Sequence, residues 1–390
     1  MYKLICTLFC AFLFFSCSSR TTFESLNDND ASDTVSESDY VISDKDSEND
    51  TDNDTDTNTN TDTDNDIDTD TDIDTDTDID TDTDIDTDID TDVDTDVDTD
   101  IDTDTDTDTA IIVGDSVQIR IVAGNITSGN KQSYDHGHGI RIFQALKPDI
   151  VLVQEMNYKN NSASDYKDFA PQIVGTNYYA VDSSDYQIPN GVVSRYQITS
   201  HGYWKDPNIN NRALMWAVVD IPGEKDIFAI SVHLHTKPPS DQTKAAQVIV
   251  DEIAKLKSSK PDKYYYVVGG DFNGDAAVSS NGFGKNNTFY IAGPDPVDEK
   301  GDEETNAGRK EQYDFVLADY PLHGFQVPTV YYSSKDSTKT KSYENGLVFD
   351  TRIYDQSVLD EYFSPAQKSD SGASNMQHMA VVKDFLIEIK

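Results

Sequence analysis

Residues 264–275 read YYYVVGGDFNGD, and this stretch says most about the fold. Its tyrosine and valine residues, from 264 to 273, form a run typical of a β-strand. The run ends in two polar residues, Asp271 and Asn273. An aspartate or asparagine at the end of a strand is most often a turn former, so this end alone predicts a turn and no chemistry.

Four further strand-like runs share this pattern: QIRIVAGNI (118–126), DIVLVQEM (149–156), ALMWAVVDI (213–221) and IFAISVHLH (227–235). Helical spacing of apolar residues appears in GIRIFQAL (139–146) and over 241–257. Strands and helices that are mixed in this way, with polar residues at the strand ends, predict a layered α/β sandwich.

The polar strand ends form a set of chemically similar residues: Asn125, Glu155, His233, His235, Asp271 and Asn273. Carboxylates and amides bind hard cations, and imidazoles transfer protons near neutral pH. Hydrolysis of a phosphodiester needs both kinds of group. Because the set contains no cysteine, it favours Mg²⁺, with Mn²⁺ or Ca²⁺ as alternatives, over a structural zinc site.

Charge divides the chain into two parts. The 390 residues carry 30 basic and 73 acidic side chains, and residues 1–109 hold 37 of the acids but only three of the bases. The other 281 residues therefore have a net charge of −9. They contain most of the aromatic and branched apolar residues and are long enough to form one large domain, which we place at 113–390.

The first 17 residues resemble a bacterial lipoprotein signal peptide. Lys3 precedes the apolar run ICTLFCAFLFF, and FFSC ends at Cys17. The resemblance implies export, lipidation of Cys17 and a lipid anchor at the outer membrane or cell surface, with the periplasmic side also possible. The alternative is an ordinary signal peptide with a chance cysteine. Cleavage before Cys17 would leave a single cysteine, hence no intramolecular disulfide.

Residues 18–112 consist largely of a Thr-Asp tract, in which every even position from Asp62 to Asp108 is aspartate. Like charges at this density repel one another, and there is little apolar surface to offset the entropy lost on ordering. The sequence predicts a disordered spacer. Specific calcium loops are not expected, because the tract lacks the glycine that lets such a loop turn.

The motifs NI, QE, NGVVSR, HLH, GDFN and YDFVL, in this order, resemble the endonuclease/exonuclease/phosphatase superfamily, and the resemblance covers nearly all of residues 117–388. It implies a four-layered α/β sandwich with two mixed β-sheets flanked by helices. It also implies metal-dependent hydrolysis of phosphate esters by a protein that we expect to be monomeric.

The resemblance also assigns roles. Glu155 would be the main metal carboxylate, with Asn125 beside it in the metal and phosphate shell. Asp271 and Asn273 would orient the attacking water and the scissile phosphate. Asp314 would polarise a catalytic histidine or assist the metal, and either His233 or His235 would contact phosphate. Arg195, in the SR-aromatic motif, would face either phosphate or a structural carboxylate, and Arg212 is interpreted in the same way.

His378 departs from the family pattern. Members commonly close with Ser-Asp-His before the last strand, whereas this chain has Gln377 before His378. A missing negative charge should lower the pKa of His378, unless Asn375 or Asp370 compensates. We expect His378 to be catalytic and to lie in a polar loop; a solvated loop histidine is the alternative.

The substrate is the most open question. A net charge of −9 gives no broad basic surface for a duplex. We expect an extracellular nuclease that positions its substrate locally. A sphingomyelinase-like or phosphoinositide-like phosphodiesterase is the enzymatic alternative, for which residues 320–332 would be the membrane-contacting segment. A catalytically weakened surface binding module is the alternative from another class.

Overall fold

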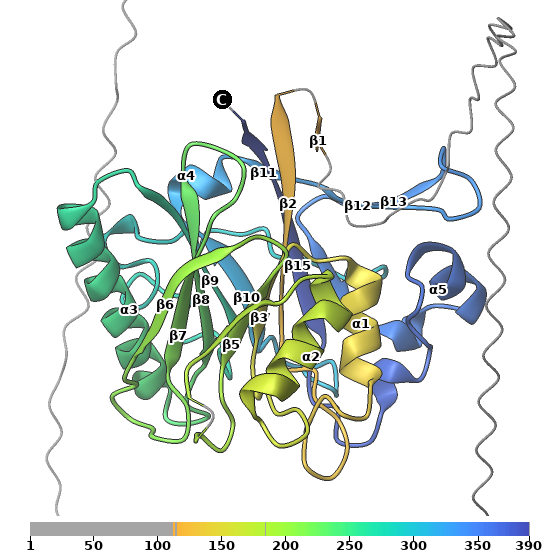
Figure 1. The fold of residues 1–390 in the computed structure, drawn as a ribbon, viewed down its shortest axis with the longest axis horizontal. Coiled ribbons are helices and arrows are strands. Elements are labelled where there is room, and N and C mark those ends of the chain that lie inside the picture. The colour runs from red at the N-terminus through yellow and green to blue at the C-terminus, as the bar shows by residue number, and fades with distance from the viewer. Residues whose placement is uncertain (1–111, 114, 184, 390) are drawn as a thin grey trace, which may run out of the picture. The chain divides into compact units, whose positions relative to one another are not determined.

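The structure is a computed structural model that describes residues 112–113, 115–183 and 185–389 (Figure 1). The predicted signal peptide (1–17), its Cys17 and all but the last residue of the predicted spacer (18–112) lie outside the described residues. Among the described residues, no helix has the length and apolar character needed to cross a bilayer.

The larger sheet has eight strands, most of them in the order β11-β15-β2-β3-β5-β4, with β1 also paired to β2 and β14 to β15. The strands are β1 (Ile112–Val113), β2 (Ser116–Gly124), β3 (Ile150–Val153), β4 (Tyr178–Val181), β5 (Gly191–Ser194), β11 (Gln326–Val327), β14 (Leu347–Phe349) and β15 (Ala380–Glu388). β2 and β3 are parallel and the other pairs are antiparallel.

The second sheet has five strands in the order β10-β9-β8-β7-β6. They are β6 (Ile198–Trp204), β7 (Leu214–Val219), β8 (Asp226–His233), β9 (Tyr264–Asp271) and β10 (Asp314–Ala318). Only β8 and β9 are parallel, so this sheet is mixed as well. A separate hairpin joins β12 (Thr329–Tyr332) to β13 (Thr340–Tyr343).

Helices cover the outer faces of both sheets (Figure 1). The helices of the described residues are α1 (His138–Leu146), α2 (Ala163–Val174), α3 (Pro239–Ser259), α4 (Tyr320–His323) and α5 (Gln356–Tyr362), with 3₁₀ turns at Lys285–Asn287, Thr351–Ile353 and Asp370–Gly372. α1 and α2 pack on the larger sheet, and α3 packs on the five-stranded sheet.

The apolar core is layered in the same way. Between the sheets, Ile121 and Leu152 of the larger sheet belong to one buried cluster with Ala229 and Val267 of the other. The alternation of strand side chains explains this, since residues two apart point to the same face. The predicted four-layered α/β sandwich with two mixed sheets is therefore confirmed.

The five strands predicted from sequence are all present, but all of them end earlier than the runs suggested, and four of these ends position site residues. β2 ends at Gly124, β3 at Val153, β8 at His233 and β9 at Asp271. As a result Asn125, Glu155 and Asn273 lie just beyond strand ends. This placement frees their side chains from the alternation of the pleated sheet and lets them turn toward the edge of the sandwich.

Candidate active site

Six predicted residues come together at one end of the sandwich, three from each sheet. Asn125 follows β2, Glu155 follows β3 and His378 precedes β15, while the other three belong to β8, β9 and β10: His233, Asp271 and Asp314. Each of the six is at most 7% exposed. The site is thus a buried polar cluster inside the edge of the molecule.

Strand register explains why the second sheet supplies three neighbours. His233 is the partner of Asp271 across the parallel pair β8 and β9, and Asp314 is the partner of Asp271 across β10. These residues therefore lie side by side in three adjacent strands. Asp271 occupies the middle position.

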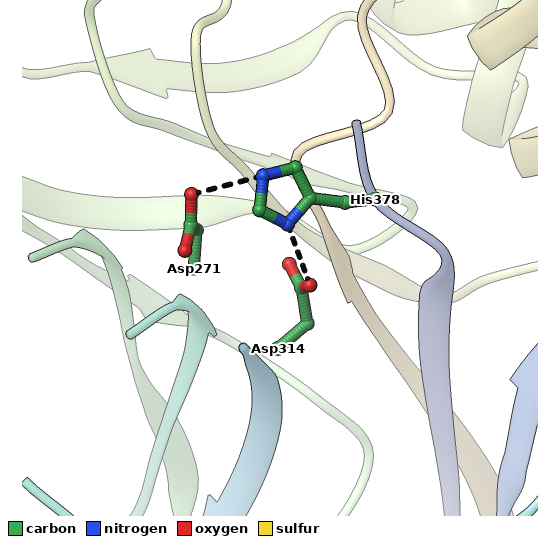
Figure 2. A group of neighbouring side chains, drawn as sticks. All are labelled: Asp271, Asp314 and His378. Carbon is green, nitrogen blue, oxygen red and sulfur yellow. Dashed lines mark hydrogen bonds and ion pairs between the residues drawn. The ribbon is translucent and has the colours of Figure 1, made fainter. Parts of the chain in front are cut away.

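His378 lies between two carboxylates (Figure 2). Its Nδ1 is 2.8 Å from Asp314 Oδ2, and its Nε2 is 3.3 Å from Asp271 Oδ2. Burial by itself would lower the pKa of His378, but the charges of Asp271 and Asp314 outweigh burial and raise that pKa to about 10. The imidazole is therefore held as a cation in this arrangement.

This geometry corrects the expected consequence of Gln377. The Gln377 side chain is exposed, and Asp314 supplies the negative charge instead. Neither suggested substitute takes part, because Asn375 donates to the Gly129 carbonyl and Asp370 pairs with Arg141. The predicted fall in the pKa of His378 is wrong. So is its placement in a polar loop, since the side chain is buried.

Glu155 faces Asn125 and Asp271. Asn125 Nδ2 donates to Glu155 Oε1 at 3.0 Å and to Asp271 Oδ2 at 3.3 Å. Burial raises the pKa of Glu155, and Asp271 adds to this, although the hydrogen bond from Asn125 opposes it. Glu155 also has a φ of 47°, a left-handed conformation that costs a residue with a side chain about 1–3 kcal/mol.

His233 behaves differently from His378. Its Nε2 is 3.2 Å from Asp271 Oδ2, but burial dominates and lowers its pKa to about 3, so the ring is neutral. Its Nδ1 is buried 3.8 Å from Glu155 Oε1 and has no hydrogen-bond partner among the described residues. The two imidazoles of the site therefore carry different charges.

The donor set fits a hard divalent cation. Three buried carboxylates, those of Glu155, Asp271 and Asp314, converge here, and one oxygen of Asp314 has no hydrogen-bond partner in the described part of the chain. Ligand atoms of Asp271, Asp314 and His378 all lie within 4.8 Å of one another. Excess buried negative charge and unpartnered lone pairs are features that a bound cation would relieve.

Asn273 lies at the rim of the site. Its backbone N–H donates to Asp271 Oδ1 at 2.9 Å, and its Nδ2 donates to the Leu234 carbonyl at 2.9 Å. It has a φ of 55°, so the chain turns sharply as it leaves β9. Asn273 therefore fixes one oxygen of Asp271.

Three further predicted residues pair with groups other than the six clustered side chains. Arg195 Nη1 pairs with Asp149 at 3.2 Å; because β5 is antiparallel to β3, Arg195 lies at the end of β3 opposite to Glu155. His235 lies beyond β8, with Nδ1 3.6 Å from Asp241 Oδ2. Arg212 donates to the carbonyls of His233 and Leu234, which makes it a positioning residue.

Sequence reasoning missed supporting residues. Thr127 Oγ1 lies 3.5 Å from both Asn125 Oδ1 and Glu155 Oε2. Gln154 Nε2 donates to Ser231 Oγ at 2.9 Å and so links the two sheets beside Glu155 and His233. The glutamine of the QE motif was visible in the sequence. Its orientation toward Ser231 depends on how the sheets pack, which a linear pattern does not show.

Comparison with known proteins adds a family match. The model of the endonuclease/exonuclease/phosphatase family matches residues 140–334, half of the chain. The chain belongs to this family. Its members are phosphoester hydrolases that depend on a divalent metal. In this family member Asn125 and His378 lie outside the matched range, and the fold brings them to the four site residues within it.

Solved structures that resemble this family member are remote in sequence. A Bacteroides thetaiotaomicron endonuclease/exonuclease/phosphatase family protein is 12% identical, with a TM-score of 0.39, over 70% of this chain and 99% of that one. A mannosyl-6-phosphatase from the same species is 12% identical, with a TM-score of 0.41, over 69% of this chain and 99% of that one. Truncated Caenorhabditis elegans TDP2 is 15% identical, with a TM-score of 0.40, over 69% of this chain and 97% of that one. No curated protein matches the sequence.

Proposed function

We propose that this chain is a metal-dependent phosphodiester hydrolase whose substrate is a nucleic acid. The observation that supports the proposal best is the position of His378 between Asp271 and Asp314, next to the carboxylate of Glu155. An imidazolium beside clustered carboxylates suits a reaction in which negative charge develops on phosphoryl oxygens.

Glu155 and Asn125 would hold the cation, for which we propose Mg²⁺. When bound, such an ion lowers the pKa of a coordinated water and offsets charge on the phosphoryl oxygens. We assign the metal to Glu155 and Asn125 because both nitrogens of His378 already face carboxylates. An imidazole that carries protons on both nitrogens has no lone pair to offer a metal.

The remaining residues would position and stabilise the substrate. Asp314 holds Nδ1 of His378, so Nε2 is the nitrogen that would turn from Asp271 to a phosphoryl oxygen. Asp271, fixed by the Asn273 backbone, would then be free to orient the attacking water. His233 is neutral and would contact the phosphate without adding charge.

Exposed surface favours a soluble polyanion over a membrane lipid. The described residues expose four large hydrophobic side chains, all tyrosines, on four different elements: Tyr178, Tyr203, Tyr320 and Tyr332. Residues 320–332, the predicted membrane segment, are divided among α4, β11 and β12. A lipid-hydrolysing surface would need a contiguous apolar patch.

A substrate panel tests the proposal. Plasmid DNA, RNA, sphingomyelin vesicles and inositol phosphates are each incubated with Mg²⁺, Mn²⁺ or EDTA. We expect hydrolysis of nucleic acid with Mg²⁺ and none in EDTA. In the His378→Ala variant turnover should fall roughly a hundredfold to ten-thousandfold. Because His378 is buried, circular dichroism must first show that the variant is folded.

The other outcomes have defined meanings. Faster hydrolysis of sphingomyelin or inositol phosphates would replace the nuclease with the phosphodiesterase alternative. No hydrolysis of any substrate would favour the surface binding module. Full activity in EDTA would reject the metal mechanism.

We also propose that the protein is exported and lipid-anchored through Cys17 at the outer face of a bacterial cell. The apolar run before FFSC supports this proposal. Labelled lipid should be incorporated into the wild-type protein and not into Cys17→Ala. Equal incorporation into both would reject it.

A further inference from the structure

A second cavity lies at another edge of the sandwich and shares no residue with the six clustered residues. It has a volume of about 290 Å³. Lys383 of β15, Gln326 of β11 and Leu317 of β10 line it, so both sheets contribute to its wall. Tyr290 and Ile291 also line it. The volume is at the lower end of the range for ligand pockets, about 300–1,000 Å³, and suits a small molecule.

Lys383 is an unusual residue for this position. On the same face of β15, Val381 and Phe385 belong to the apolar core between the sheets. Lys383 is only 8% exposed, yet within the described part of the chain its ammonium makes no hydrogen bond or ion pair. Burial lowers its pKa to about 8, although Asp295 opposes this shift. A buried cation without an ion pair is costly, so an anionic ligand would stabilise it.

The cavity also offers a buried acceptor and negative charge. Gln326 Oε1 is buried and makes no well-formed hydrogen bond to any described residue, although the Gln326 side chain interacts with His323 and raises the pKa of that ring. Asp295 is half-buried in the lining, and Glu344 is exposed there. A ligand with a hydrogen-bond donor or a positive charge would therefore interact favourably with these groups.

Much of the remaining lining is apolar or aromatic, although Asn345 also lines the cavity. Tyr290 and His323 stack with ring centroids 3.6 Å apart, and burial together with the charge of Lys383 lowers the pKa of His323, so this ring is neutral at pH 7. Ile291, Leu317 and Pro328 complete the wall. Two adjacent opposite charges on an apolar frame match this distribution.

We propose that the cavity binds a small zwitterion, with its carboxylate against Lys383 and its ammonium group against Gln326 Oε1 and Asp295. L-leucine is a suitable probe because it carries both charges on an apolar frame. Two analogues each lack one charge: 4-methylpentanoate lacks the amine, and 3-methylbutylamine lacks the carboxylate. The proposal is independent of the hydrolase function.

Calorimetric titration of the full chain at pH 7 tests it. L-leucine should bind the wild type more tightly than either analogue. In Lys383→Met, which keeps the length of the stem, L-leucine binding should weaken at least about tenfold, because a charged hydrogen bond is lost. Gln326→Met should weaken the binding of L-leucine and leave the affinity for 4-methylpentanoate unchanged. The exposed Lys255→Met is the control and should bind like wild type.

Three results would overturn the proposal. One is the absence of L-leucine binding to the wild type up to about 10 mM. Another is equal L-leucine affinity in wild type and Lys383→Met. The third is 4-methylpentanoate binding as tightly as L-leucine, which would mark a simple anion site. Cooperative unfolding of each variant and an unchanged hydrolysis rate show that a binding defect lies in this cavity and not in the active site.

Discussion

Glu155 combines two unfavourable features. Its backbone is left-handed, and burial raises the pKa of its carboxyl. Such costs are retained where the surrounding structure enforces them, and they are common at functional sites. A bound divalent cation would offset the electrostatic part.

Replacing Glu155 with Gln keeps the size of the side chain and removes its charge. We expect Mg²⁺ affinity and turnover each to fall at least about tenfold to a hundredfold, since the proposed metal ligand is lost. Calorimetric titration with Mg²⁺ measures the affinity. Thermal unfolding in EDTA should show no loss of stability. Equal stabilisation of variant and wild type by Mg²⁺ would contradict the assignment.

Gln377 and Asp314 give a matched pair of substitutions. Gln377→Asp should leave turnover and its pH dependence nearly unchanged, because the side chain is exposed and Asp314 already pairs with His378. Asp314→Asn should lower turnover by roughly a hundredfold or more, since the imidazolium loses its buried partner. Rate measurements from pH 5 to about 9 compare the two. A large rise in turnover in Gln377→Asp would show that Asp314 does not pair with His378 in solution.

Lys383 predicts how stability depends on pH. Its pKa is 10.5 in the unfolded chain and about 8 in the folded protein. Below pH 8 it is charged in both states, and the cost of burial is present in full. Between these values only the unfolded chain keeps the proton, so the free energy of unfolding rises with pH relative to Lys383→Met.

The lining groups do not obscure this trend. The lowered pKa of His323 keeps that ring neutral across the window, and the wild type and Lys383→Met have the same two lining carboxylates, Asp295 and Glu344. Urea unfolding of both proteins at pH 7, 8, 9 and 10 measures the difference. If the free energies of unfolding of the two proteins differed by the same amount at every pH, Lys383 would have to be solvated.

At the scale of elements, β9 approaches its neighbours closely at two glycines. A Cβ atom at Gly269 would lie 2.7 Å from the Phe315 carbonyl and 2.9 Å from Leu152 Cδ1. Gly270 has a φ of 134°, a conformation that side chains rarely adopt, and a Cβ there would strike Gln154 at 2.5 Å. The strand can carry Asp271 into the site only because these positions lack side chains.

Gly270→Ala should therefore destabilise the protein by about 1–3 kcal/mol and lower turnover, because Asp271 is displaced. Gly308→Ala is the control, since a Cβ there meets only Asn306 Oδ1, at 3.9 Å. Denaturant unfolding and a hydrolysis assay compare the two. Equal stability of both variants would show that β9 has more space than its contacts indicate.

Sequence patterns could identify the elements because apolar alternation and helical spacing are local properties. They also identified the six clustered residues, because the family motifs place chemistry at strand ends. They could not decide whether Arg195 faces a phosphate or a structural carboxylate such as Asp149. The answer depends on the antiparallel direction of β5, which places Arg195 beside Asp149. The family resemblance did give Asp314 the role of polarising a histidine, but it did not specify His378, which lies 64 residues away in the chain.

At the scale of the whole molecule, every residue of the proposed site lies between 125 and 378. Deleting residues 30–108 removes none of them. Turnover on a small soluble substrate, bis(p-nitrophenyl) phosphate, should be unchanged by this deletion, and steady-state rates of the two purified proteins measure it. A large loss of turnover in a deletion protein that still unfolds cooperatively would assign the acidic segment a part in catalysis.

The clustered residues come in equal number from two sheets that otherwise meet through an apolar core and a few hydrogen bonds such as the one from Gln154 to Ser231. An ion held by Glu155 and Asn125 on one sheet, facing the carboxylate of Asp271 on the other, would oppose shear of one layer over its neighbour. Metal occupancy would then slow amide hydrogen exchange in β3 and β9 together, although the two strands belong to different sheets. The bound ion would act as a cross-link between the layers, so rigidity and catalytic competence would be gained in the same event.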